Sequence, residues 1–189
     1  MKKAALKIIE AVPIKLDIGC GKNKQPGFIG VDKIAFEGVD HVLDIGSKPL
    51  PYGDSTVAEI FSSHCVEHLK PLERIHFVNE AYRVLEKEGK MTIIVPHWAS
   101  CRAYGDMTHQ WPPVSEFWFY YLDKAWRKVN APHNDSEFVE WGYSCDFHPT
   151  WGYGMHASLL TRNSEYQQFA MQWWKESIAD IHATLVPRK

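Results

Sequence analysis

The chain has 189 residues, of which 45% are hydrophobic and 23% charged, and this predicts one globular domain with a substantial buried core. Its formal net charge of -2 gives no general attraction to nucleic acid or to an anionic membrane, and no run of about 18 apolar residues indicates a membrane span. Four widely spaced cysteines form no Cys-x-x-Cys pair, which argues against a zinc knuckle or a disulfide framework and predicts a reducing, cytoplasmic setting.

Short apolar runs alternate with helical patterns in the first half of the chain, which is typical of an α/β domain with a mainly parallel sheet. The expected strands are residues 15–18, 29–31, 41–43, 59–62 and 90–95. Apolar residues at steps of three and four predict a helix over residues 71–88, ended by Gly89. Its apolar stripe is formed by Leu72, Ile75, Val78, Tyr82 and Leu85.

The second half of the chain has a different texture, because residues 97–134 are crowded with aromatic and histidine side chains. One helix is expected near residues 114–125. Two strand-like runs, residues 136–147 and 155–163, flank the turn-rich stretch "HPTWGYG" and predict a hairpin. A last amphipathic helix is predicted over residues 164–183, with Tyr166, Phe169, Trp173 and Ile181 on its apolar face.

A glycine-rich turn follows the first expected strand in the stretch "LDIGCGKNKQPGFIGVDK". Such a turn presents backbone N–H groups at the carboxyl edge of a parallel sheet, where open α/β folds bind their ligands. Lys24 stands where a dinucleotide motif has its third glycine, and Asp32 follows Gly19 by only 13 positions instead of about 20. A ligand with ribose hydroxyls and no pyrophosphate relaxes these requirements, since an acid that ends the second strand can still accept two hydroxyl hydrogen bonds.

An ordered series of motifs extends over about residues 14–96. "LDIGCG" is followed by "IGVDK", by "VDHVLDIGSKPLPYGDSTVAEIFSSHCVEHL" and by "NEAYRVLEKEGKMTIIVP". The series resembles the class I S-adenosylmethionine-dependent methyltransferases, in particular the small group with "LD-x-G-C-G" at its first motif. The resemblance implies a Rossmann-like α/β fold, with a mostly parallel seven-stranded sheet and a C-terminal antiparallel hairpin, and S-adenosyl-L-methionine as the cofactor.

The resemblance also implies a set of cofactor-binding residues. These are Asp17, Gly19, Cys20 and Gly21 at the methionine end, Asp32 on the ribose, Asp44 and Ile45 near the adenine, and Ser63 and His64 beside the sulfonium. The family pattern is broken at residues 22–27, which are too few for a first helix and whose lysines are expected to face solvent. Asp44 fits an Asx-type turn as well. Glu67 and His68 are either structural or part of the pocket.

The segment after the fifth strand is expected to cover the methyl group. We expect His97 and His109, with Asp106, to line the acceptor site and one histidine to act as the base. The alternative is a packed aromatic cap with partly exposed histidines. The same three residues have the composition of a two-His-one-carboxylate metal site. Nothing in their spacing demands one, so no metal is predicted.

The predicted reaction is methyl transfer to a small O or N acceptor. Two alternatives stay open: a protein that binds the cofactor without methylating, and an enzyme that uses it for other chemistry such as lyase cleavage. DNA or RNA is disfavoured as the acceptor because "SSHCVEH" stands where amino-directed enzymes carry Asp/Asn-Pro-Pro-Tyr/Phe. Only a flipped or free base stacked on Trp or Tyr stays open. The domain would comprise a cofactor-binding half (1–96), an acceptor-site cap with the hairpin (97–163) and a C-terminal helix (164–189).

Overall fold

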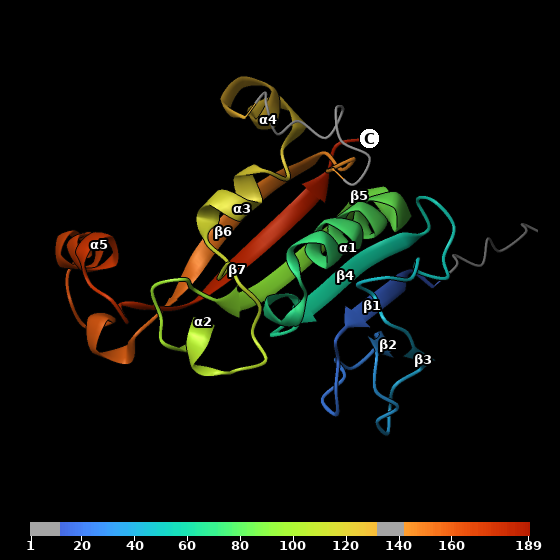
Figure 1. Cartoon of the computed structure of the whole chain (residues 1–189), viewed down its shortest axis with the longest axis horizontal. Helices are drawn as coiled ribbons and strands as arrows, with labels where there is room; N and C mark the ends of the chain where they lie inside the picture. Colours follow the sequence, from blue (N-terminus) through green and yellow to red (C-terminus); the bar gives the residue numbers. More distant parts are fainter. Residues whose placement is uncertain (1–11, 132–141) are drawn as a thin grey trace, which may run out of the picture.

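A seven-stranded sheet runs through the computed structural model, which describes residues 12–131 and 142–189 (Figure 1). Its strands are β1 (Ile14–Ile18), β2 (Ile29–Asp32), β3 (His41–Val42), β4 (Val57–Ser63), β5 (Leu85–Pro96), β6 (Phe147–Met155) and β7 (Ile178–Pro187). They lie in the order β3-β2-β1-β4-β5-β7-β6. β7 runs antiparallel to both of its neighbours, while the pairs from β3 to β5 are parallel. This confirms the predicted fold class.

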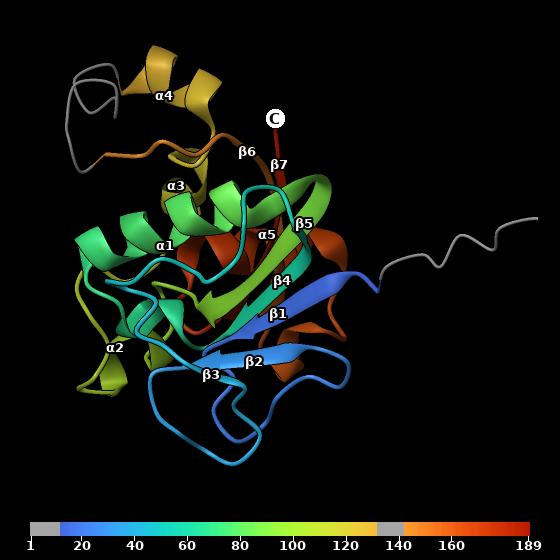
Figure 2. The same cartoon turned by 90° about the vertical axis from the view of Figure 1, so that its right-hand side faces the viewer.

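The helices gather on one side and at one end of this sheet. They are α1 (Pro71–Val84), α2 (Arg102–Gly105), α3 (Glu116–Tyr120), α4 (Lys124–Asn130) and α5 (Ser164–Trp173), with 3-10 turns η1 (Val66–His68) and η4 (Ala157–Leu159). Figure 2 shows α1, α3 and α4 on the same side, and α2 at the carboxyl ends of β4 and β5. No helix within residues 12–131 or 142–189 is long and apolar enough to cross a membrane.

The two faces of the sheet carry different side chains. The face under α1 is apolar and fully buried at Leu16, Ile60, Met91 and Ile181. On the other face Glu59 bonds Lys15 at 2.8 Å and Lys90 at 3.2 Å. The short loop at residues 22–27 contains no helix, as expected from the sequence, and neither does the connection from β2 to β3. Because these two connections contain no helix, they do not cover the face opposite α1, and charged side chains occupy it.

The predicted helix over residues 71–88 is too long, and its predicted apolar stripe is only partly right. The helix ends at Val84, because Leu85 already pairs with Val57 as part of β5. Leu72, assigned to the stripe, is 54% exposed. Val78 of the predicted stripe is fully buried and Tyr82 packs against the core. The buried residues of the helix are Arg74, Phe77, Val78, Ala81 and Val84. The sequence pattern overlooked part of this face because an arginine stands in its first turn.

The second half departs further from the predicted elements. The supposed turn at residues 148–154 lies inside β6, and the supposed strand at 155–163 contains η4. β6 accommodates proline and glycine because it is an edge strand. Part of the other supposed strand, residues 136–147, lies outside the described residues.

The two predicted helices of this half are also wrong in extent. The last one ends at Trp173, and residues 178–187 form β7. Ile181, Ala183 and Leu185 are buried there while His182 is exposed, an alternation of period two that is typical of a strand. The helix expected near 114–125 is divided into α3 and α4, with Asp123 capping α4 through the Trp126 N–H.

Arg74 connects α1 to the segment that follows α2. It is 4% exposed, and the acceptors of its guanidinium among the described residues are all main-chain carbonyls. Nε reaches Val66 and Leu69 at 3.1 and 2.9 Å. Nη1 and Nη2 reach Pro112 and Gln110 at 2.6 and 2.9 Å. The side chain therefore fixes η1 and residues 110–112 in one arrangement.

The turn after β1 depends on two glycines with positive φ. Gly19 has φ +73°, and a Cβ there would lie 2.4 Å from Cys65 Sγ. Gly21 has φ +53° and open space around a Cβ. Glycine is therefore required at position 19 both by the positive φ and by the lack of space for a Cβ, whereas at position 21 only the positive φ requires it.

Arg74→Gln should lower the free energy of unfolding by at least about 3 kcal/mol, since it leaves buried carbonyls without a charged donor. Urea unfolding followed by circular dichroism measures this. The exposed arginine Arg162, which lies over the ring of Tyr166, serves as the control, and Arg162→Gln should cost less than about 1 kcal/mol. Equal costs for the two variants would contradict the role given to Arg74.

Gly21→Ala should cost about 1–2 kcal/mol in unfolding free energy, the strain of a left-handed alanine. Gly19→Ala should cost at least about 3 kcal/mol, since overpacking against Cys65 adds to the same strain. Cys65→Gly removes the obstacle, so Gly19→Ala should cost less in that background than in the wild type. Equal losses for both alanine variants, measured by urea unfolding, would show that the contact with Cys65 is unimportant.

Candidate active site

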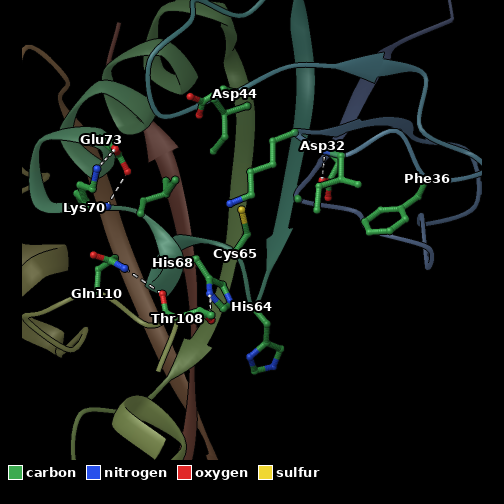
Figure 3. Close-up of a pocket in the computed structure, with 15 residues that line it drawn as sticks. Asp32, Phe36, Asp44, His64, Cys65, His68, Lys70, Glu73, Thr108 and Gln110 are labelled. Carbon is green, nitrogen blue, oxygen red and sulfur yellow. Dashed lines mark hydrogen bonds and ion pairs between the residues drawn. The ribbon is translucent and has the colours of Figure 1, made fainter. Parts of the chain in front are cut away.

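A cavity of about 930 Å³ opens at the carboxyl ends of β1, β2 and β4. Five residues expected at the cofactor line it: Gly19, Asp32, Asp44, Ile45 and His64. In Figure 3 Asp32 and Phe36 lie on one side of this cavity, opposite Lys70 and Glu73 from the start of α1. The edge and the position are those at which open α/β sheets bind ligands.

Asp32 is held in place by two main-chain N–H groups. Its Oδ2 accepts from Gly21 N at 2.9 Å and its Oδ1 from Ile34 N at 2.9 Å. The residue is 9% exposed and lines the cavity. Because each carboxylate oxygen can accept more than one hydrogen bond, both oxygens keep capacity for a ligand. The second-strand acid is thus a fixed double acceptor.

Asp17 and Cys20 lie behind the cavity wall instead of on it. Asp17 is 3% exposed, and its Oδ2 accepts from Gln25 N at 2.7 Å. Burial raises the pKa of this carboxyl above its ordinary value. The Cys20 thiol is buried beside Gly30. These side chains anchor the short loop, and a ligand would meet this part of the chain through the main chain of Gly19.

The two lysines of the short loop have partners within the protein. Lys24 Nζ bonds Asp40 Oδ2 at 2.8 Å, and that same oxygen accepts from Gly30 N. Lys22 Nζ lies 5.5 Å from the centre of the Phe36 ring. Lys22 is exposed, as expected, but Lys24 is engaged in an ion pair. The pair closes the loop that stands where related folds have a first helix.

Asp44 forms the Asx-type turn expected as one interpretation, and it also lines the larger cavity. Its Oδ1 accepts from Gly46 N at 3.1 Å, which is an Asx turn, and its Oδ2 accepts from Ser47 Oγ at 2.7 Å. The Ser47 hydroxyl is the main cause that lowers the pKa of Asp44 below its ordinary value. Asp44 and the buried Ile45 both line the cavity. The turn therefore presents an ionised carboxylate next to an apolar wall.

His64 stands at the end of β4 with φ +52°, a conformation that is uncommon for a residue other than glycine. Its Nδ1 lies 3.3 Å from Glu67 Oε1, and this hydrogen bond is the main cause that raises the pKa of His64. Burial raises the pKa of the neighbouring Cys65 thiol to about 12. Ser63 is the last residue of β4 and pairs with Ile94. It lines neither the cavity described above nor the second cavity beside it.

A second cavity of about 470 Å³ adjoins the first, and His64 and His68 belong to both. Asp106 and His109, two of the three residues expected at the acceptor site, line it. Thr108 donates to Asp106 Oδ1 through both its N–H, at 2.8 Å, and its hydroxyl, at 2.7 Å. These bonds lower the pKa of Asp106 below its ordinary value.

His97 does not share this location. It is 3% exposed and lines neither of these two cavities. Its Nδ1 accepts from Ala99 N at 3.2 Å, so Nε2 carries the proton that is donated to Glu116 Oε1 at 3.0 Å. Both ring nitrogens are thus engaged. His97 connects the end of β5 to α3, and its contacts are those of a packed structural histidine.

Sequence reasoning missed several residues that line the larger cavity. These include Lys33, Phe36, Cys65, Lys70, Thr108 and Gln110. Lys33 directly follows the second-strand acid, and this position was the one available signal. Thr108 and Gln110 come from the segment after α2, and Gln110 N donates to Glu67 O at 2.8 Å. No local sequence pattern predicts a contact between parts of the chain that are this far apart in the sequence.

No family model and no curated protein matches the chain. A SAM-dependent methyltransferase from Archaeoglobus fulgidus is 19% identical with a TM-score of 0.63, over 93% of this chain and 86% of its own. A chain in the complex of the Haloferax volcanii Trm112 methyltransferase activator with a candidate methyltransferase is 11% identical with a TM-score of 0.52, over 94% and 82%.

Geranyl diphosphate C-methyltransferase from Streptomyces coelicolor, solved with Mg2+, geranyl diphosphate and S-adenosyl-L-homocysteine, is 15% identical. Its TM-score is 0.50, over 93% of this chain and 74% of its own. At these identities the likeness concerns the fold. The chain has the class I fold of S-adenosylmethionine-dependent methyltransferases.

Proposed function

We propose that the protein is a methyltransferase that takes a methyl group from S-adenosyl-L-methionine and transfers it to a small O or N acceptor. The observation that carries this proposal is the carboxylate of Asp32, fixed at the wall of the larger cavity beside the Gly19–Gly21 turn. A fixed double acceptor at this place suits the two vicinal hydroxyls of a ribose.

The rest of the larger cavity suits the same cofactor. Phe36, Ile45 and Leu69 give it an apolar lining for an adenine ring, and Asp44 stands beside them as a polar acceptor. The short loop of residues 22–27 contains no helix whose N-terminus could bind a pyrophosphate. A cofactor with a ribose and no phosphate therefore fits this loop better than a dinucleotide does. The main chain of Gly19 and Gly21 is our candidate for the methionine end.

The acceptor belongs in the second cavity, where His64 and His68 separate it from the first. The bound cofactor supplies an electrophilic methyl group on a sulfonium. The chain must then align the acceptor, exclude water and take up the acceptor's proton. His109 Nδ1 donates to Ala103 O at 3.1 Å, so Nε2 keeps a lone pair for that proton. We assign this role to His109, with Asp106 at the rim, and leave His97 out.

Asp32→Asn should weaken the binding of S-adenosyl-L-methionine and S-adenosyl-L-homocysteine about 10- to 100-fold. The change removes a charged acceptor, and hydrogen bonds to charged groups contribute about 1.5–3 kcal/mol. Isothermal titration calorimetry measures both affinities. Asp54→Asn is the matched control, because Asp54 is an exposed carboxylate that bonds Arg83 and lines neither cavity described above. It should leave both affinities unchanged.

Three outcomes separate the proposal from its alternatives. No measurable binding of either ligand to the wild type overturns it. Binding without methyl transfer to any member of a broad panel of small O and N acceptors favours a cofactor-binding protein that does not methylate. Release of methylthioadenosine, identified by mass spectrometry, favours a lyase.

A further inference from the structure

Three potential metal ligands converge beside the second cavity: Glu67, His68 and His109. One ligand atom from each lies within 4.8 Å of the others. Glu67 and His68 come from η1, whereas His109 comes from the segment after α2. This set differs from the trio of His97, Asp106 and His109 considered from the sequence. It shares only His109 with that trio, because His97 faces Glu116 instead.

Glu67 carries a buried oxygen that lacks a partner. The residue is 4% exposed and lines the second cavity. Its Oε1 lies 3.3 Å from His64 Nδ1, but Oε2 has no hydrogen-bond partner within the part of the chain that the structure describes. An unpaired buried carboxylate oxygen is costly, so a native structure that keeps one calls for an explanation.

The proton positions of the two imidazoles follow from their neighbours. His109 Nδ1 faces a carbonyl oxygen, Ala103 O, and therefore donates. Thr108 Oγ1 gives its hydrogen to Asp106 Oδ1 at 2.7 Å, so it accepts from His68 Nδ1 at 3.0 Å. Both Nε2 atoms are left with a lone pair. A second-shell hydrogen bond from the other ring nitrogen is what metal-binding histidines almost always have.

One ligand atom from each imidazole and one from the Glu67 carboxylate therefore lie within 4.8 Å of one another, each imidazole has a free lone pair and Glu67 has an unpaired oxygen, an arrangement that a cation stabilises. We propose that Glu67, His68 and His109 bind a divalent first-row transition metal, with Zn2+ as the type case. Two imidazoles favour such a metal over Mg2+ or Ca2+. At Zn–N distances of about 2.0–2.1 Å, tetrahedral ligand atoms lie about 3.3 Å apart, so the separations between the ligand atoms shorten by at most about 1.5 Å on binding.

Three protein ligands leave a tetrahedral metal with one open position, as in catalytic zinc sites. The second cavity borders all three ligands, so the open position faces it. If the proposed function holds, on which this step rests, the acceptor is a compound whose oxygen or nitrogen coordinates the metal. Coordination to the metal lowers the pKa of the acceptor, so that water can take its proton. His109 then no longer serves as the base, because its Nε2 lone pair binds the metal.

Metal binding is tested with the metal alone, so its failure is distinct from a failure to bind the cofactor or to methylate. Full-length protein without a histidine tag is stripped with a chelator and titrated with Zn2+ by calorimetry. Co2+ is titrated in parallel, and its visible absorption reports four- or five-coordinate geometry. We expect one metal ion per chain and Co2+ bands of low coordination number.

Glu67→Gln and His109→Gln should each weaken Zn2+ binding at least about 100-fold, and they keep the size and polarity of the side chain. His148→Gln is the matched control, since His148 is exposed on β6 and bonds Arg188. It should leave the affinity and the stoichiometry unchanged. Thermal unfolding monitored by circular dichroism shows whether each variant is folded.

Two results overturn the proposal. One is the absence of Zn2+ and Co2+ binding to the folded wild type. The other is an affinity that Glu67→Gln and His109→Gln leave unchanged in folded protein, or that His148→Gln lowers equally. Loss of S-adenosyl-L-methionine binding with intact Zn2+ binding would contradict the proposed function and leave the metal site standing.

Discussion

The buried guanidinium of Arg74 determines how the two cavities are assembled. Burying a cation is expensive, and here the cost is offset by carbonyl oxygens of η1 and of residues 110–112. η1 supplies Glu67 and His68, and the chain just before residue 110 supplies Thr108 and His109. Together with the hydrogen bond from Gln110 N to Glu67 O, this side chain therefore holds the turn after β4 against the cap. Site residues whose relative positions must be accurate to about 0.5 Å need a rigid support of this kind.

Carboxylates around the larger cavity are oriented by main-chain N–H groups. Asp17 accepts from Gln25, Asp32 from Gly21 and Ile34, and Asp44 from Gly46. These bonds fix the acids before any ligand arrives, so little side-chain entropy is lost on binding. They also explain how a loop of six residues replaces a whole helix. The loop is closed by its bonds to Asp17 and Asp40.

The sequence predicted the first half of the fold well because its signals are local. Gly19 and Asp32 stand at strand ends, where motif spacing reports position directly. Arg74 was overlooked because the pattern of a helix assigns a charge to solvent, and only carbonyls distant in sequence make its burial tolerable. The sequence pattern assigned β7 to a helix. The alternation of buried and exposed residues that identifies it as a strand is created by its position between β5 and β6, which lie far from it in the sequence. The cap residue Gln110 depends on the same long-range contacts.

His64 and His68 form a common wall between the two cavities. A ligand that shifts either imidazole changes the surface offered to a ligand on the other side. Thermodynamic linkage makes such an effect mutual: the factor by which the first occupant alters the affinity for the second equals the factor in the opposite direction. If both cavities take ligands, a shared wall of this kind makes the affinity measured at one cavity depend on whether the other is occupied.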